Sequence, residues 1–598
     1  MAYFLKITNK KKGKYLQIYE SFYNKEKKNT SHKSFKTLGF ENDLIASGIV
    51  NPIEFYSNEV KKLNTQLKLK KESDKIKLID VSPVRYLGYF PIKNILDGLA
   101  VSKHINLLQY NRSFHFSISD VMEALVYSRI INPASKFKSF HDVIPYLCHS
   151  DYSFSYDQLL SALGMMGDEY EKIIEIFSRR VACRYGTDTS STYFDCTNFY
   201  FEIDKENAFQ RKGPSKENRK DPIVGLGLLL DSNLIPIGMK MYPGNQSEKP
   251  VIREVINSLK HQNNITGKTV QVADKGLNCA ANIYAARKHN DKDGYIFSKS
   301  IKQLSDKEMK WILNKNNKYT YVTDKDGEIK YRYTSIIDTF YYEFTDENGK
   351  KHNFSCKEKR VLTFNPSLCE KQRFELNKML EKAKKLKASQ AKKSEYGESS
   401  KYVNFLSSNE DGKAIDKKII VEINKKKYEE DYAIAGYNLL VTSESTMSDE
   451  DIYNTYHNLW RIEETFRIMK SELDARPVFC QTERTIKGHF LICYIAVLLC
   501  RILEFKVLRN KICAFELYEF MRTYKVLKES NGNYINISSS TDTIITLANT
   551  FKLPLRNFYL SDKQIKMMLN HIIWSEHHFF IFTSKVRFYY VNIFFYFF

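Results

Sequence analysis

The chain has 598 residues, and its 92 lysines and arginines outnumber its 70 aspartates and glutamates, which gives a net charge of +22. Because 43% of the residues are hydrophobic and only 23 are glycine and 13 proline, the composition excludes a disordered or fibrous protein. The length allows several domains, and the positive charge favours a nucleic-acid partner, the alternative being a lysine-rich proteome.

Cysteine usage and the length of the apolar runs indicate the cellular compartment of the protein. The ten cysteines contain no Cys-x-x-Cys pair, so we expect neither a zinc site of the usual spacing nor a disulfide framework. The N-terminal stretch MAYFLKITNKKKGKY is not a signal peptide, because its apolar part is short and the positive charge follows it. The longest apolar run, 490–500, is too short to cross a bilayer and predicts a buried helix. We expect a cytoplasmic protein with reduced thiols and no membrane association.

The N-terminal third is predicted to be basic and then helical. Short apolar stretches alternate with lysine-rich turns over residues 1–45, which predicts a β-hairpin, and 46–78 reads as one exposed helix. Together they define a basic region over 1–90. Helical periodicity then recurs through 91–185, with Ser119 and Asp120 as caps of one helix, and predicts a helical domain for DNA binding or assembly.

Residues 186–300 change to alternating strands and helices, which predicts a mixed α/β layer. Residues 301–437 contain charged short strands and a very basic helix at 374–394, whose lysines either face solvent or contact the DNA backbone. Residues 438–510 contain a strand, one long helix at 449–473 and a buried helix near 490–507. A helical region is expected over 511–570.

The final segment, 571–598, has 12 aromatic residues in 28 and no helical or strand period. A tail of this kind would expose apolar surface or aggregate. We expect the natural end of the protein to lie near residue 571 and the remainder to be out-of-frame or read-through sequence. A membrane anchor is the alternative, although Lys585 and Arg587 interrupt the run.

Three acidic residues stand out by their context. Asp195 lies inside the predicted strand STYFDCT, where aspartate is disfavoured and a buried carboxylate needs a partner. Asp274 ends the strand TVQVADKG, and strand ends are where catalytic groups collect in α/β sheets. Glu463 lies in the helix WRIEETFRIMK. Two such aspartates and one glutamate can converge to hold two divalent cations, as phosphoryl chemistry requires.

Each acid also has an ordinary interpretation. Asp195 could be a salt-bridged strand residue, Asp274 a turn residue, and Glu463 a solvated helix residue like its neighbour Glu464. Spacing alone does not select the three. Three further acids compete with them: Asp188, Asp204 and Glu472.

The long helix resembles the Tyr–Arg–Glu–Lys signature of DDE transposases from bacterial insertion sequences. Tyr456, Glu463 and Lys470 fall on the signature, whereas its Arg position holds Leu459. The candidates for the missing charge are Arg461 and Arg467.

Other segments resemble the same family in the same order. YFDCTNFYFE at 193–202 is similar to the first-Asp strand, and VADKGLNCAANI at 272–283 to the second-Asp motif. A Gly-Asn-x-x-Glu stretch lies at 244–248, and ARPVF at 475–479 resembles the end of the domain. The stretch SRIINPASK at 128–136 resembles a subgroup with a long N-terminal region.

The resemblance implies an α/β fold with a ribonuclease-H-like catalytic core, interrupted by a largely β insertion and preceded by a mainly helical N-terminal region. The core would comprise 186–300 and 438–510, and the insertion 301–437. The 189-residue gap between Asp274 and Glu463 agrees with an insertion at that point.

The resemblance also implies an activity. Asp195, Asp274 and Glu463 would bind two Mg²⁺ or Mn²⁺ ions, water would cut at the ends of the element, and the freed 3′-hydroxyl would attack target DNA. Tyr456 and Lys470, about four turns apart, would share the face of Glu463 and bind DNA, together with Arg461 or Arg467. The expected partners are double-stranded end and target DNA and a second copy of the chain, in the cytoplasm at the nucleoid.

Two other functions remain open from the sequence. The chain could be an inactive remnant that only binds DNA. The aromatic tail would agree with such decay, whereas the presence of all three acids argues against loss of the metal ligands. It could also be a stand-alone metal-dependent nuclease that cleaves without joining.

Overall fold

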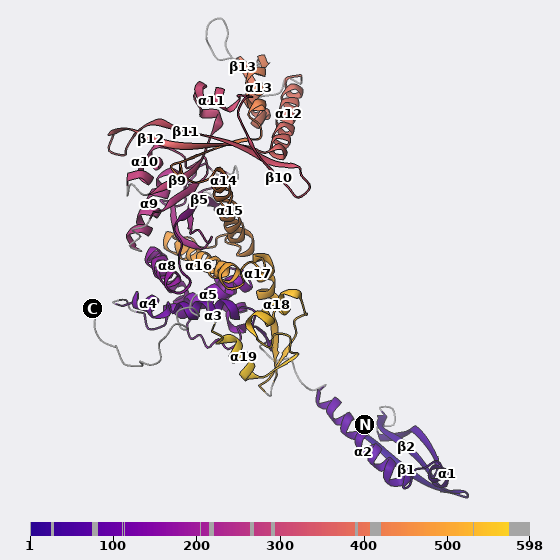
Figure 1. The fold of residues 1–598 in the computed structure, drawn as a ribbon. Coiled ribbons are helices and arrows are strands. Elements are labelled where there is room, and N and C mark those ends of the chain that lie inside the picture. Colours follow the sequence, from indigo (N-terminus) through magenta and orange to yellow (C-terminus); the bar gives the residue numbers. More distant parts are fainter. Residues whose placement is uncertain are drawn as a thin grey trace, which may run out of the picture. The chain divides into compact units, whose positions relative to one another are not determined.

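The computed structural model divides the chain into two compact units, Met1–Ser82 and Pro83–Phe598 (Figure 1). It describes residues 2–24, 29–73, 82–110, 112, 114–203, 205–214, 220–262, 268–288, 293–388, 393–406, 420–529 and 532–572. Most of the aromatic tail, 573–598, and the competing acid Asp204 therefore lie outside the described residues.

The first unit is a small sheet with one long helix. Three antiparallel strands, β1 (Ala2–Lys10), β2 (Gly13–Asn24) and β3 (Asn29–Phe40), precede α1 (Glu41–Ala46) and α2 (Pro52–Ser73). The Asn64 side chain of α2 bonds both the N–H and the carbonyl of Tyr3, each at 2.8 Å, and so fixes the helix on β1. The prediction of a hairpin missed β3, because this strand is mostly exposed and lacks apolar alternation.

The second unit begins with helices that surround one buried helix. Their bounds are α3 (Phe90–Leu99), α4 (Ser102–Leu107), α5 (Ile118–Ile131), α6 (Lys136–Lys138), α7 (Tyr156–Asp168) and α8 (Tyr170–Tyr185). They share one core with α16 (Glu483–Arg501), whose residues from Phe490 to Leu499 are fully buried. Among the described residues, no helix is both long and apolar enough to span a membrane.

Two glycines let α7 approach α16 closely. A Cβ at Gly167 would collide with the Arg484 carbonyl, and a Cβ at Gly488 would collide with the Leu163 carbonyl. The cap of α5 differs from the prediction: Ser117, and not Ser119 or Asp120, accepts the N–H of Asp120 as N-cap.

A nine-stranded mixed sheet forms the other half of this unit, in the order β10-β11-β12-β15-β9-β8-β5-β6-β7. Its central strands are β5 (Ser191–Tyr200), β8 (Val270–Ala273) and β9 (Gly294–Lys299), which run parallel, flanked by the antiparallel β6 (Ile223–Leu230), β7 (Pro236–Pro243) and β15 (Tyr437–Thr442). The helices α9 (Glu248–Gln262) and α10 (Ala280–Lys288) cover one face. The expected α/β class is confirmed.

The segment 301–437 adds strands to this same sheet. A long hairpin of β11 (Ile329–Thr345) and β12 (Lys351–Phe364) pairs with β15, and β10 (Thr320–Thr323) forms the edge. Its helices are α11 (Asp306–Ile312), α12 (Pro366–Ala388) and α13 (Lys425–Ala433), with the short strands β13 (Val403–Leu406) and β14 (Ile420–Ile423). The strands are longer than predicted, and the basic helix begins at Pro366 and not at residue 374.

The C-terminal region is not purely helical. The helices α17 (Ala514–Thr523), α18 (Asp542–Phe551) and α19 (Asp562–Leu569) accompany a small sheet. That sheet contains β16 (Lys525–Lys528), β17 (Tyr534–Asn536), β18 (Tyr559–Leu560) and, from the start of the unit, β4 (Val84–Tyr86). Strands this short give too few residues for a period to be recognised in the sequence.

The helix predicted over 449–473 is divided into three parts. The first is α14 (Asp449–His457), the second α15 (Trp460–Arg467), and a π-helical turn, η5 (Ile468–Glu472), completes the run. Between the first two parts the chain tightens, because the N–H of Leu459 bonds the Tyr456 carbonyl at 3.0 Å, one residue short of the α-helical spacing. The three parts therefore do not present one regular helical face.

A buried ion cluster fixes α15 to the end of α16. The Arg501 guanidinium, 1% exposed, donates to Glu504 at 2.6 Å and to Glu464 at 2.9 Å. Arg461 donates to the same Glu464 carboxylate at 3.1 Å. Burial raises the pKa of Glu464, but Arg501 and Arg461 outweigh it and lower this pKa below its usual range. Glu464 is thus a structural residue and not the solvated one that the sequence indicated.

Removing the central cation should destabilise the unit. Arg501→Met leaves two carboxylates without their partner, a loss that costs about 3–5 kcal/mol for a buried pair, so the thermal midpoint should fall by several degrees. The matched control is Arg467→Met, since Arg467 reaches the same Glu464 at 3.8 Å with a side chain that is 73% exposed. This exposed pair is worth less than about 1 kcal/mol. Equal midpoints for the two variants in differential scanning calorimetry would contradict the assignment.

Candidate active site

The register of the parallel strands puts two predicted acids next to each other. Tyr193 of β5 pairs with Val272 of β8, which pairs in turn with Ile296 of β9. Side chains alternate along a strand, so the position two residues further on each strand lies on the same face. Those positions are Asp195 and Asp274, with Ser298 beside them on β9.

Local hydrogen bonds orient both aspartates. Asp274 immediately follows β8, and its Oδ1 accepts the N–H of Gly276 at 2.7 Å. A Cβ on Gly276 would lie 3.1 Å from the same oxygen, so the turn favours glycine here. The Oδ1 of Asp195 accepts the N–H of Cys196, also at 2.7 Å. Both carboxylates are half-buried, which leaves part of each open to solvent.

Glu463 approaches from the helix that packs on this face. Ile462 and Phe466 of α15 are 0% and 6% exposed and join the core that contains Tyr193. Between α14 and α15, the Asn458 amide donates to the Tyr193 hydroxyl at 3.4 Å. Glu463 itself is exposed. The helix is therefore seated on the face of the sheet that carries Asp195.

Tyr456 lies near all three predicted acids. Its phenol is half-buried at the end of α14. Burial, together with the carboxylates of Asp274, Glu463 and Asp195, raises the pKa of Tyr456 to about 12, although Ser298 acts in the opposite direction. The structure thus brings all three predicted acids within electrostatic range of one phenol, which stays protonated at neutral pH.

The predicted cations differ in their surroundings. Lys470 lies with its Nζ 5.4 Å from the centroid of Phe199, which is on the same face of β5 as Asp195. The Arg461 guanidinium stacks 3.9 Å from the Trp460 ring and bonds Glu464, so it belongs to the buried ion cluster. Arg467 is the most exposed of the three.

The competing acids that the structure describes have structural partners. Asp188 accepts the N–H of Ser190 at 2.9 Å before β5 begins. Glu472 pairs with Arg522 at 2.9 Å.

Ser298 lies beside Asp274 by strand register, and the sequence did not single it out. One serine in GYIFSK has no distinguishing signal, and only the strand register reveals its place beside Asp274.

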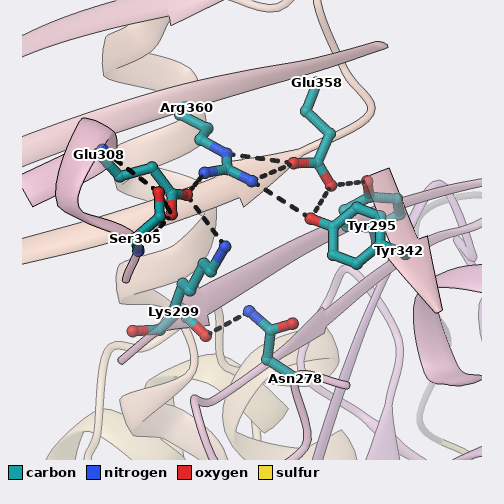
Figure 2. A network of polar contacts seen from close by, with 9 residues as sticks. Asn278, Tyr295, Lys299, Ser305, Glu308, Tyr342, Glu358 and Arg360 are labelled. Carbon is teal, nitrogen blue, oxygen red and sulfur yellow. Dashed lines mark hydrogen bonds and ion pairs between the residues drawn. The ribbon is translucent and has the colours of Figure 1, made fainter. Parts of the chain in front are cut away.

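A second polar network holds the end of β9. Figure 2 shows Arg360 of β12 between the carboxylates of Glu308 and Glu358, both of which it contacts. Lys299, which follows Ser298, donates to Glu308 at 3.2 Å. The hydroxyls of two tyrosines donate to Glu358, which is 0% exposed: Tyr295 and Tyr342. The network fastens the long hairpin to the strand that carries Ser298.

Buried donors hold the chain where it leaves the acid-bearing helix. The Glu472 carbonyl accepts from Arg522, and the Ala475 carbonyl accepts from His489 at 3.0 Å. The two carbonyls between them, of Leu473 and Asp474, each accept from Arg129 at 3.4 Å. Lys136 lies 3.1 Å from the other ring nitrogen of His489. Arg129 and Lys136 come from SRIINPASK. Arg129 donates to two of the carbonyls at this helix end, and Lys136 contacts the histidine that binds a third.

The donor set suits a hard divalent cation, since all three acids offer carboxylate oxygens. Asp195 and Asp274 form an adjacent pair, and Glu463 lies on the neighbouring helix with an exposed side chain. Across the described ranges, no group of three or more His, Cys, Asp or Glu side chains is close enough to hold a metal ion. The three carboxylates therefore lie around the site but farther apart than the ligands of one bound ion.

The structure of the piggyBac transposase synaptic complex with hairpin DNA matches with a TM-score of 0.34 and 10% identity, over 74% of this chain and 79% of that one. A likeness at this level has no bearing on the fold or the function. No curated protein matches the chain.

A family model gives the decisive match. The family described as "Transposase DDE domain" matches residues 201–499. The match covers half of the chain, begins where β5 ends and includes Asp274 and Glu463. The chain therefore belongs to the family of transposases with a DDE domain.

Proposed function

We propose that the chain is a DNA transposase of a bacterial insertion sequence, which cuts the ends of its element by metal-dependent hydrolysis and joins the 3′-hydroxyl to target DNA. The observation that carries this proposal is the strand register that places Asp195 beside Asp274, with the helix that bears Glu463 packed on the same face of the sheet. Membership of the DDE transposase family supports it.

The proposed core is ribonuclease-H-like. The order β7-β6-β5-β8-β9, with β6 antiparallel to both neighbours and β5, β8 and β9 parallel, supports this assignment. The segment 301–437 would be the insertion, because it enters after β9 and the chain returns to the core through β15 before α14.

Asp195, Asp274 and Glu463 would hold two Mg²⁺ or Mn²⁺ ions. When bound, such ions activate the attacking water or 3′-hydroxyl and stabilise the leaving oxygen. The hydrogen bond from the Gly276 N–H positions the Asp274 carboxylate, and the packing of α15 on β5 positions the glutamate. No covalent protein–DNA intermediate is required.

Of the four predicted DNA-binding residues, Tyr456, Arg467 and Lys470 would face the DNA. The phenol hydroxyl of Tyr456 is protonated at neutral pH, as in an ordinary tyrosine, and can donate a hydrogen bond to a phosphate oxygen. Lys470 and the exposed Arg467 would supply positive charge to the backbone. Arg461 would act by holding Glu464 and the helix in place.

The proposed partners are double-stranded end and target DNA and a second copy of the chain, at the nucleoid in the cytoplasm. The helices of 91–185 remain the predicted module for DNA binding or assembly. On α12, Lys382, Lys384, Lys385 and Lys387 are all exposed. Their charges are available to a polyanion.

Substitution of each acid tests the metal site. Asp195→Asn, Asp274→Asn and Glu463→Gln should each reduce Mg²⁺-dependent nicking of end DNA by more than about 100-fold, since even an outer-shell partner of a metal ligand costs 10–100-fold. DNA binding without metal should be largely retained. The readout is a gel assay of labelled end DNA with Mg²⁺ or with EDTA.

The matched control is Glu450→Gln, an exposed acid in the first turn of α14. Its nicking should equal that of the unmodified protein. Full activity in any one of the three acid variants would remove that residue from the metal site. Nicking without strand transfer would favour the nuclease, and binding without any nicking would favour the inactive remnant.

Charge removal on α12 tests the DNA-backbone face. Replacing Lys382, Lys384, Lys385 and Lys387 with alanine should weaken binding to end and random DNA alike, because phosphate contacts do not read sequence. The slope of log K against log salt should flatten by about 0.9 for each phosphate that a lysine no longer neutralises. A salt titration by fluorescence anisotropy measures both effects. An unchanged slope would mean that this face only meets solvent.

A further inference from the structure

A groove lies where β5 ends and where the chain leaves the acid-bearing helix. It has a volume of about 670 Å³ and is formed by residues 200–203, Lys205 and Gln210 on one side and by 476–481 on the other. The residues that carry the inference are Tyr200, Ile203, Lys205, Arg476 and Phe479. Both of its walls are continuous with elements that bear the acids, although none of the three acids lines it.

The groove combines planar apolar surface with positive charge. The Phe479 side chain is 68% exposed, and Ile203 is 38% exposed. The Arg476 guanidinium lies 4.1 Å from the centroid of the Tyr200 ring, in a cation–π contact. Arg476 and Lys205 outnumber the one acid among the lining residues, Glu202. Exposed aromatic rings beside cations are the chemistry that single-stranded nucleic acids bind.

The wall that carries Arg476 and Phe479 is anchored at its first residue. His489 donates to the carbonyl of Ala475, the residue before Arg476. Burial, reinforced by Lys136 and Arg129, keeps the pKa of His489 well below its usual value, so the ring is neutral and one nitrogen accepts while the other donates. This anchor fixes the backbone next to Arg476, which lowers the ordering cost of binding at that residue.

The groove is within reach of the site along one DNA strand. Asp195 and Tyr200 are five residues apart on β5, about 17 Å at the usual rise of a strand. This odd spacing turns their side chains to opposite faces of the sheet, so a DNA strand would reach the groove around the end of β5. Lys470 lies against Phe199, between the two. One strand of B-form DNA covers this distance in about five nucleotides.

We propose that this groove binds an unpaired segment of the DNA strand next to the cleavage site, with Phe479 stacked on a base and Arg476 and Lys205 contacting phosphates. The proposal rests on the transposase function proposed above and names a DNA subsite for it. A paired base would offer Phe479 only its edge, because its face is stacked within the duplex. The exposed ring therefore favours an unpaired strand over a duplex.

Fluorescence anisotropy in EDTA can test this without the catalytic reaction. The probes are a labelled single strand of about 12 nucleotides and a duplex of about 20 base pairs. Phe479→Ala should weaken single-strand binding about 5- to 100-fold, the usual range for loss of one stacked base, and leave duplex binding unchanged. Phe479→Trp should restore binding, since its ring can stack.

The matched control is Phe515→Ala, because Phe515 on α17 is similarly exposed at 62%. It should bind both probes as the unmodified protein does. Equal loss of single-strand and duplex binding in Phe479→Ala, or no loss in either, would overturn the proposal. A photo-crosslink from a 5-iodouracil single strand should fall within 474–481, and crosslinks only elsewhere would also overturn it.

The binding test of the groove and the nicking test of the metal site can fail independently of each other. If the acid variants lose nicking while Phe479→Ala binds single strands normally, the transposase function stands and only the subsite fails. If the acid variants nick normally while Phe479→Ala loses single-strand binding, the groove binds DNA but the proposed cleavage chemistry fails.

Discussion

The parallel pairing of β5 with β8 is the constraint on which the site depends. Because Tyr193 pairs with Val272, the next residues on that face are two aspartates in adjacent strands. A slip of one residue would turn one aspartate to the opposite face, where α9 and α10 pack. The fully buried strands on either side, rich in Val, Leu and Ile, prevent such a slip by the apolar area it would expose.

Much of this arrangement was predictable from the sequence. The strands and helices of 186–300 follow from their periodicity, and the resemblance to a signature directed attention to Tyr456, Glu463 and Lys470. Their convergence with Asp195 and Asp274 could not be derived from spacing, because it depends on strand order. Likewise Glu464 and Arg501 are 37 residues apart, and nothing local indicates that they meet. The division of the helix at 458–459 also has no local signal such as proline or glycine.

Buried ionic groups recur around the site in place of apolar packing. Arg501 and Arg360 are 1% and 2% exposed, and each lies between two carboxylates. Such clusters add little net stability over a hydrophobic substitute, because desolvation offsets the attraction. Their directional hydrogen bonds instead restrict the position and orientation of α15 and β9. A catalytic centre needs such restriction, since small displacements of its groups are costly in rate.

The long hairpin of β11 and β12 has a consequence for how this protein can be shortened. Its strand β12 covers β15 with a continuous antiparallel ladder from Lys359 to Phe364. Excision of 301–437 would remove β12 and leave the N–H and carbonyl groups of β15 that now pair with it exposed along the edge of the sheet. Open edges of this kind recruit other strands and aggregate. Natural or engineered miniature forms of this chain would therefore have to supply a replacement edge strand, or block that edge with charge or proline.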